Sequence, residues 1–210
     1  MTFDGAVFEA REINAWRGDR HILRDVSFSV RPGEFLKVTG PNGVGKTTLL
    51  RVICGLLPAE TGELFWRGKS VRGRRDEFNF ELGHLGHLNS LKGDLTAREN
   101  LKFLAGLRTT LTAQTIDATL DRVGILSRGD LPARSLSAGQ KRRLALARLL
   151  LADAALWILD EPVTNLDTAG IRLVEELIVD HVEHGGLAIA AAHQRLLDDA
   201  PCLRRLELEP

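Results

Sequence analysis

A glycine-rich segment of this chain is followed by a lysine and two threonines. From Gly40 to Thr47 the sequence fits the phosphate-binding pattern G-x-x-x-x-G-K-[ST] in full. Glycines allow the backbone to turn so that its N–H groups point at a phosphate, and the following helix adds its positive end. Lys46 would contact the β- and γ-phosphates, and the Thr47 hydroxyl would bind Mg²⁺. The run predicts a nucleoside triphosphate site made of Gly40, Pro41, Asn42, Gly43, Val44, Gly45, Lys46, Thr47 and Thr48.

Two carboxylates follow a continuous apolar run at residues 155–159. Such a run is typical of a strand buried on both faces of a parallel sheet, and these sheets bind ligands at the carboxyl ends of their strands. Asp160 would therefore suit the shell of a bound Mg²⁺. Glu161, one residue later, is our candidate for the base that orients or deprotonates an attacking water. The alternative is a strand that ends in two solvated acids, and the upstream phosphate loop argues against it.

A histidine follows another apolar segment, which runs from Leu187 to Ala192. If this segment is the neighbouring strand, His193 leaves it toward the same crevice and can contact the γ-phosphate or the water. The alternative is a surface histidine at a strand end. We predict that His193, Glu161 and Lys46 form the catalytic group.

A second anion site is predicted at residues 136–140, which read Leu-Ser-Ala-Gly-Gln. Ser137 and Gln140 fit a capping box, so this segment begins a helix. Ser137, Gly139 and Gln140 could also bind phosphate at the positive helix end. A cap is the alternative, and the two roles are compatible. The basic residues that follow, among them Arg142 and Arg148, favour the phosphate-binding interpretation.

The remaining sequence indicates an α/β protein with a helical middle. Alternation and apolar runs predict strands near both ends, and 3.6-residue periodicity with N-cap residues predicts helices between them. The basic stretch 67–75 is expected to be a solvated hairpin. We interpret residues 91–151 as a helical subdomain inserted into a core formed by residues 1–90 and 152–210. The expected strands cover 7–16, 26–30, 34–39, 62–66, 155–159 and 187–192, and the expected helices 46–54, 97–107, 113–123, 137–151 and 168–183.

Composition excludes several classes of protein. The 210 residues suffice for one well-buried domain, and 28 basic residues balance 28 acidic ones, so no overall field favours nucleic acid. No apolar run approaches the roughly 20 residues that span a bilayer, and the first residues do not look like a secretory signal. Cys54 and Cys202 have no motif spacing, which favours free thiols in a reducing, cytoplasmic setting.

Together these motifs resemble the nucleotide-binding subunits of ATP-binding cassette (ABC) transporters over essentially the full length. Residues 136–140 correspond to the signature motif of that family, residues 160–161 to the Walker B aspartate and catalytic glutamate, 165–167 to the D-loop and His193 to the switch histidine. The resemblance implies a P-loop NTPase fold: a RecA-like parallel-sheet core with an antiparallel β subdomain and an inserted α-helical subdomain. It also implies ATP and Mg²⁺ as cofactors, and a homodimer with two ATP molecules between the phosphate loop of one copy and the signature of the other.

Two positions depart from the family pattern. The family usually has a glutamine that senses Mg²⁺ and the membrane partner, and spacing places His87 there, as a candidate metal contact. His84 and His87 could also be a small metal site, but a third ligand is missing. The family usually stacks a tyrosine on adenine. Here Trp16 or Arg17, just before Gly18, would take that role.

Several segments are similar to a narrower family, the ATP-binding subunits of bacterial heme exporters used in cytochrome c maturation. They are residues 40–51, 62–68, 85–87, 155–162 and 191–194, and the compact length, with no extension beyond Pro210, also fits. The resemblance implies a peripheral protein on the cytoplasmic face of the bacterial inner membrane, paired with integral membrane permease subunits. Those partners would handle heme, since the chain has no C-x-x-C-H motif for covalent attachment.

Three alternatives stay open at this point. The same ATPase subunit could drive another cargo, such as a lipoprotein, a lipid or a drug. A soluble cassette ATPase in iron–sulfur assembly is a second possibility, whereas DNA repair and translation are disfavoured by the single cassette and the lack of a basic excess. A scaffold without hydrolysis is disfavoured because Lys46, Asp160, Glu161 and His193 are all present.

Overall fold

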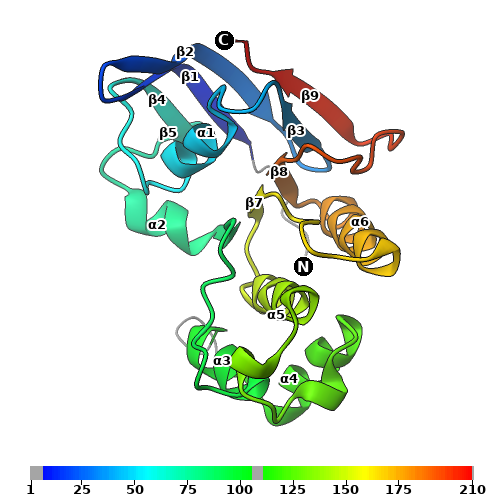
Figure 1. Ribbon diagram of the computed structural model, residues 1–210. Coiled ribbons are helices and arrows are strands. Elements are labelled where there is room, and N and C mark those ends of the chain that lie inside the picture. The colour runs from blue at the N-terminus through cyan, green and yellow to red at the C-terminus, as the bar shows by residue number, and fades with distance from the viewer. Residues whose placement is uncertain (1–6, 106–110, 210) are drawn as a thin grey trace.

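The computed structural model describes residues 7–105 and 111–209 and shows two sheets with helices around them (Figure 1). The elements follow one another in this order: β1 (Phe8–Arg17), β2 (Arg20–Val30), β3 (Phe35–Thr39), α1 (Lys46–Ile53), β4 (Thr61–Trp66), β5 (Lys69–Ser70), α2 (Arg75–Phe80), β6 (Leu82–Leu85), α3 (Ala97–Ala105), α4 (Ala113–Arg122), η1 (Leu126–Arg128), η2 (Ala133–Ser135), α5 (Ala138–Leu151), β7 (Leu156–Asp160), α6 (Thr168–Glu183), β8 (Leu187–Ala191) and β9 (Leu203–Glu207).

The central sheet has five strands in the order β6-β7-β8-β3-β9, and every neighbouring pair is parallel. All five carboxyl ends therefore lie at one edge, where parallel sheets hold their ligands. The phosphate loop follows β3, the two carboxylates end or follow β7, and His193 follows β8. The sheet topology thus brings three motifs that are far apart in sequence to the same edge.

The second sheet is antiparallel, has the order β2-β1-β4-β5, and lies beside α1 (Figure 1). Its strands β1 and β2 form a long hairpin that turns at residues 17–20. The observed arrangement confirms the expected α/β fold with a parallel sheet and a separate antiparallel sheet. Within residues 7–105 and 111–209, no helix combines the length and apolarity needed to cross a bilayer.

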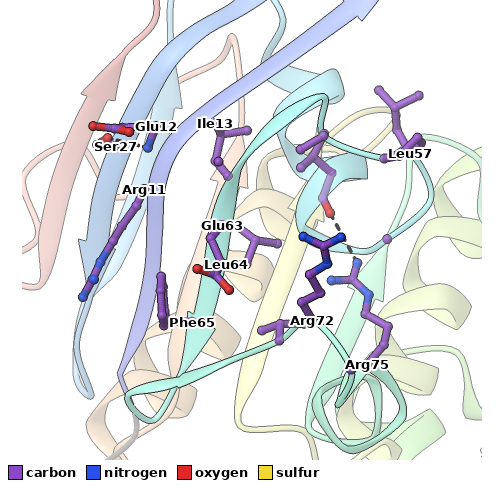
Figure 2. A pocket seen from close by; sticks show the side chains of 17 residues that line it. Arg11, Glu12, Ile13, Ser27, Leu57, Glu63, Leu64, Phe65, Arg72 and Arg75 are labelled. Carbon is purple, nitrogen blue, oxygen red and sulfur yellow. Dashed lines mark hydrogen bonds between the residues drawn. The ribbon is translucent and has the colours of Figure 1, made fainter.

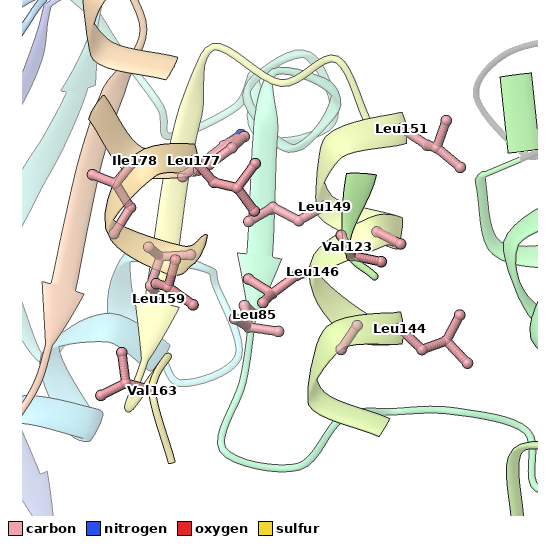
Figure 3. Packing of buried hydrophobic residues seen from close by; sticks show 14 of the residues in the cluster. Leu85, Val123, Leu144, Leu146, Leu149, Leu151, Leu159, Val163, Leu177 and Ile178 are labelled. Carbon is pink, nitrogen blue, oxygen red and sulfur yellow. The ribbon is translucent and has the colours of Figure 1, made fainter. Parts of the chain in front are cut away.

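The parallel sheet separates two apolar clusters because successive strand residues point to opposite faces. On β7, Trp157 and Leu159 belong to the cluster under α3–α6, whereas Leu156 and Ile158 belong to the cluster under α1 and the antiparallel sheet. Figure 3 shows leucines of α5 and α6 packing around Leu85 and Leu159. All five residues of β7 are buried, which confirms the strand buried on both faces that the apolar run predicted.

The expected strands and helices are confirmed, with ends that differ by a few residues, except that β2 begins six residues earlier than expected. Residues 106–107 of the expected helix 97–107 lie outside the described residues. Sequence reasoning missed α2, β6 and β9, which are short and carry no clear periodicity. The division into residues 91–151 and the rest stays a prediction. One buried cluster is continuous across it, since Leu101 of α3 and Leu144 of α5 share that cluster with β7.

Candidate functional site

The phosphate loop joins β3 to α1 and depends on glycine at two close contacts. Gly40 and Gly45 have φ values of 134° and 120°, a region that L-residues rarely adopt. A Cβ at Gly40 would come within 2.5 Å of the Leu208 carbonyl oxygen, and one at Gly45 within 2.8 Å of the Ile22 side chain. The loop is therefore held between the tail after β9 and strand β2, and a larger residue would displace it.

Lys46 lies over this loop with its charge almost fully buried. Its side-chain Nζ donates hydrogen bonds to the carbonyl oxygens of Gly40 at 2.7 Å and Pro41 at 2.9 Å, and the residue is 6% exposed. Burial lowers the pKa of Lys46, while the nearby carboxylates of Glu161 and Asp160 act in the opposite direction. The ammonium group is thus placed in the loop beside both acids, as a charge available to phosphate.

Thr47 and Asp160 are brought together although 113 residues separate them. The Thr47 hydroxyl, in the first turn of α1, donates a 3.0 Å hydrogen bond to Asp160 Oδ1 at the end of β7. Asp160 is 5% exposed. A carboxylate and a hydroxyl oxygen at this separation are the ligand types that Mg²⁺ prefers, so the residues fit that ion.

Glu161 and His193 form a second pair beside the first. The His193 imidazole Nε2 lies 3.5 Å from Glu161 Oε1, and the His193 backbone N–H donates to Glu161 Oε2 at 3.4 Å. Strands β7 and β8 are adjacent, with Asp160 opposite Ala191, so Glu161, one residue further, and His193, two residues further, leave the sheet side by side. Glu161 has a φ of 50°, and its N–H donates to the Ala191 carbonyl at 2.9 Å. A carboxylate and an imidazole at this separation can together hold a water molecule.

The segment 136–140 caps α5 as predicted. Ser137 Oγ accepts a hydrogen bond from the Gln140 N–H at 3.2 Å, and Gln140 Oε1 accepts one from the Ser137 N–H at 2.9 Å. A Cβ at Gly139 would lie 2.9 Å from the Asn165 carbonyl oxygen, so this helix start packs on the segment that follows Glu161. In the described part of the chain, no hydrogen bond joins residues 137–140 to residues 40–48.

The exposed Trp16 lies near the end of the β1–β2 hairpin. Its indole stacks in parallel on the His21 ring across the hairpin, with centroids 4.4 Å apart, and the residue is 47% exposed. His21 precedes Ile22, the residue against which Gly45 packs. Trp16 is therefore attached to the strand that supports the phosphate loop, with His21 covering one face of its ring.

The residues around the expected glutamine position differ in burial. His87 is exposed, whereas His84 is half-buried at the end of β6. Burial and the charge of Arg148 lower the pKa of His84. Within the described ranges, no group of three or more histidine, cysteine, aspartate or glutamate side chains could hold a metal ion. The predicted site residues therefore lie at or next to the carboxyl edge of the parallel sheet, except for the signature segment and Trp16, which lies on the antiparallel sheet.

The arginines of α5 do not form a phosphate-binding face, and that part of the sequence argument was wrong. Arg142 is 2% exposed and donates inward to backbone carbonyls, and Arg148 donates to the carbonyls of His84 and Ser90. The sequence contained a signal for this, because Arg142 precedes Leu146 and Leu149 by four and seven residues and so shares their core-facing stripe.

A cavity of about 960 Å³ lies away from these motifs, between β1, β4 and the segment after α1 (Figure 2). Arg11, Glu63 and Arg72 line it together with apolar residues, and Arg75 reaches the carbonyl oxygens of Val52 and Ile53 at its wall. None of the predicted site residues lines it.

Comparison with known proteins gives a consistent result. Residues 23–164 match the ABC transporter family. The chain is 40% identical over 203 residues to the cytochrome c biogenesis ATP-binding export protein CcmA of Vibrio vulnificus, covering 96% of this chain and 99% of that protein. It is 45% identical over 192 residues to the cytochrome c biogenesis ATP-binding export protein CcmA 2 of Cupriavidus metallidurans, covering 91% of each chain.

Solved structures agree on the fold. A putative ABC transporter ATP-binding protein from Pyrococcus furiosus has a TM-score of 0.82 and 25% identity, covering 96% of this chain and 97% of that chain. An ATP-binding subunit of an ABC transporter has a TM-score of 0.83 at 21% identity, covering 97% and 88%.

Proposed function

Because this chain belongs to the ABC transporter family, we propose that it hydrolyses ATP to energise the export or release of heme for cytochrome c maturation. The observation that carries the ATPase part is the meeting of Lys46, the Thr47–Asp160 pair and the Glu161–His193 pair at one sheet edge. The heme part rests on the relatives, whose names assign them to cytochrome c biogenesis and export.

The proposed mechanism uses each group at the place where the fold holds it. Residues 40–48 bind the phosphates through backbone N–H groups, and Lys46 stabilises the charge of the β- and γ-phosphates. Glu161 accepts a proton from the water that attacks the γ-phosphorus, and ADP leaves. His193, hydrogen-bonded to Glu161 through its backbone, orients that carboxylate and contacts the γ-phosphate.

Thr47 and Asp160 would hold Mg²⁺, and His87 would reach it through a bound water. When bound, the ion neutralises charge on the β- and γ-phosphate oxygens. The hydrogen bond from Thr47 to Asp160 supports this assignment because it holds the two oxygens 3.0 Å apart, where one ion could bind both.

A second copy of the chain would complete the site. Ser137 is exposed and belongs to a helix start without a hydrogen bond to the phosphate loop in the described ranges, so its anion-binding end is available to another molecule. We assign Ser137, Gly139 and Gln140 of each copy to the ATP held by the phosphate loop of the other. Closure of this homodimer on two ATP molecules would be the step that moves the membrane partners.

The surface around α2 and β6 is our candidate for contact with the integral membrane permease subunits. Leu56, Phe80 and Leu88 are 65%, 62% and 79% exposed, and a cavity of about 420 Å³ lies beside them, lined in part by Leu56, His84 and Leu149. Exposed apolar side chains at the rim of a groove are typical of interaction sites. The chain would thus sit peripherally on the cytoplasmic face of the bacterial inner membrane, without nucleic acid, and leave heme to those partners.

The test is cytochrome c maturation in cells whose only copy is altered. Lys46→Ala should abolish holo-cytochrome c, measured by heme staining, because the phosphate site loses its charge. Lys69→Ala, at an exposed position of β5, is the matched control and should leave maturation intact. Full maturation with Lys46→Ala at normal protein level would contradict the heme assignment and favour another cargo.

A further inference from the structure

The side chain of Arg142 is the most completely buried charge in the described part of the chain, and all its donors are used. Its Nε donates to the Pro162 carbonyl at 3.0 Å, and its Nη2 donates to the carbonyls of Asp160 at 2.8 Å and Glu161 at 2.7 Å. Its Nη1 donates to the Gly86 carbonyl at 2.8 Å and to Asn89 Oδ1 at 3.1 Å. A guanidinium has five N–H groups, so every one has an acceptor.

These five bonds connect two separate segments. One is residues 160–162, which contain the candidate base. The other is residues 86–89, which follow β6 and include the exposed His87 and Leu88 on the candidate partner-facing surface. Four of the five acceptors are backbone carbonyls at or after the ends of β6 and β7, and the fifth is the Asn89 side chain. The planar guanidinium of an arginine fixes the relative positions of such acceptors, whereas the ammonium group of a lysine does not.

The conformation of Glu161 gives this connection a functional meaning. A φ of 50° in a residue other than glycine is costly, and it persists only where the surroundings hold it. The surroundings here are the Glu161 N–H bond to Ala191 on one side and the Arg142 bonds to the carbonyls of residues 160–162 on the other. Loss of the guanidinium would leave the backbone free to relax and carry the carboxylate away from His193.

Arg148 provides a comparison on the same helix. It is half-buried and donates 3.3 Å bonds to the carbonyls of His84 and Ser90, so it also holds the segment after β6. Within the described ranges it makes no hydrogen bond to residues 160–162. Arg148 therefore stabilises residues 84–90 alone, whereas Arg142 contacts both this segment and residues 160–162 at the end of β7.

We propose that Arg142 is a positioning residue: its guanidinium, held on one side by residues 86–89, keeps the Glu161 backbone in the conformation that places the candidate base. This inference rests on the proposed function, because it assumes that Glu161 is the base. The side chain would act through the position of the base and would not touch ATP.

The experiment compares Arg142→Gln, Arg142→Lys and Arg148→Gln in the full-length protein, with kcat, the ATP Kd and Tm measured for each. Both Arg142 variants should lose on the order of 10- to 100-fold in kcat, since displacement of a catalytic group by about 1 Å has effects of that size, and the Kd should stay within about threefold. Lysine is included because it keeps the charge and loses the planar guanidinium. Arg148→Gln should lower Tm while kcat stays within about threefold of wild type.

Asn89→Ala is a second test, for the case in which Arg142→Gln does not fold. It removes one acceptor of the Arg142 guanidinium, and it should lower kcat with little change of Tm. Wild-type kcat in Arg142→Lys or in Asn89→Ala would overturn the proposal, as would equal kcat losses in Arg142→Lys and Arg148→Gln. Absence of ATPase activity in the wild-type protein, or full activity of Glu161→Gln, would instead overturn the proposed function on which it rests.

Discussion

Ser137 has two roles in this account, and a pair of substitutions separates them. Its hydroxyl caps α5 through the Gln140 N–H, and in a closed dimer it would donate to the phosphate held by the other copy. Ser137→Ala removes both roles. Ser137→Asp keeps the cap, because aspartate and serine are about equally good N-cap residues, but directs a negative charge at the phosphate.

The expected magnitudes follow from these contacts. Loss of the cap costs about 1 kcal/mol. For a chain of this size that corresponds to a decrease in Tm of roughly 2–4 °C. A hydrogen bond to a charged phosphate contributes about 1.5–3 kcal/mol, so Ser137→Ala should lower kcat by roughly 10- to 100-fold. Ser137→Asp should keep the wild-type Tm and yet hydrolyse ATP more slowly than Ser137→Ala.

The assays are thermal unfolding by circular dichroism, steady-state ATP hydrolysis, and equilibrium ATP binding to the isolated chain. ATP binding to the phosphate loop should be unchanged in both variants, because in the described ranges no hydrogen bond joins residues 137–140 to that loop. Wild-type hydrolysis by Ser137→Asp would refute the idea that this helix start faces phosphate. A loss of rate in Ser137→Ala alone, in step with its lower Tm, would reduce Ser137 to a cap.

Two further predictions concern aromatic contacts. If Trp16 stacks on adenine, Trp16→Ala should raise the ATP Kd by roughly 10- to 100-fold, since base stacking contributes about 1–3 kcal/mol. Trp16→Phe should raise the Kd less. An unchanged Kd of Trp16→Ala, measured by calorimetry, would exclude Trp16 as the residue that stacks on adenine. His181 stacks on Trp157 with ring centroids 3.9 Å apart, and burial lowers the pKa of His181 from its usual 6.5 to about 4. The unfolded chain therefore takes up the proton first as pH falls, and His181 should cost up to about 3 kcal/mol of stability between pH 6.5 and 4. Urea unfolding across that range should show a weaker pH dependence for His181→Gln, and equal slopes would contradict the assignment.

The sequence predicted those parts of the site whose chemistry depends on neighbours along the chain. The phosphate loop is one continuous turn in which the required φ values and the charge are encoded by consecutive residues. The strand that ends at Asp160 was visible because a sheet buried on both faces demands an unbroken apolar run. The sequence assigned Thr47 and Asp160 to Mg²⁺ separately, and the common edge of parallel strands, which needs only strand direction, explains why the structure brings them together.

Other features depend on contacts that a sequence does not display. The strand β6 is four residues long and contains a glycine and a histidine, so its pairing with β7 decides its structure. The strand β9 has basic and apolar residues in no clear order and is recruited by β3. The helical spacing to Leu146 indicated that Arg142 is buried, but the sequence does not show that its acceptors are carbonyls at the ends of two distant strands.

We propose that Glu161 is the base in an ATP site and that a second copy of the chain completes this site. The most direct measurement is the mass and turnover of Glu161→Gln with ATP and Mg²⁺, by light scattering on a size-exclusion column and by phosphate release. We expect an ATP-bound dimer whose turnover has fallen by at least about 100-fold, because loss of a general base has effects of that order. Turnover at the wild-type rate, or a monomer with ATP bound, would contradict it.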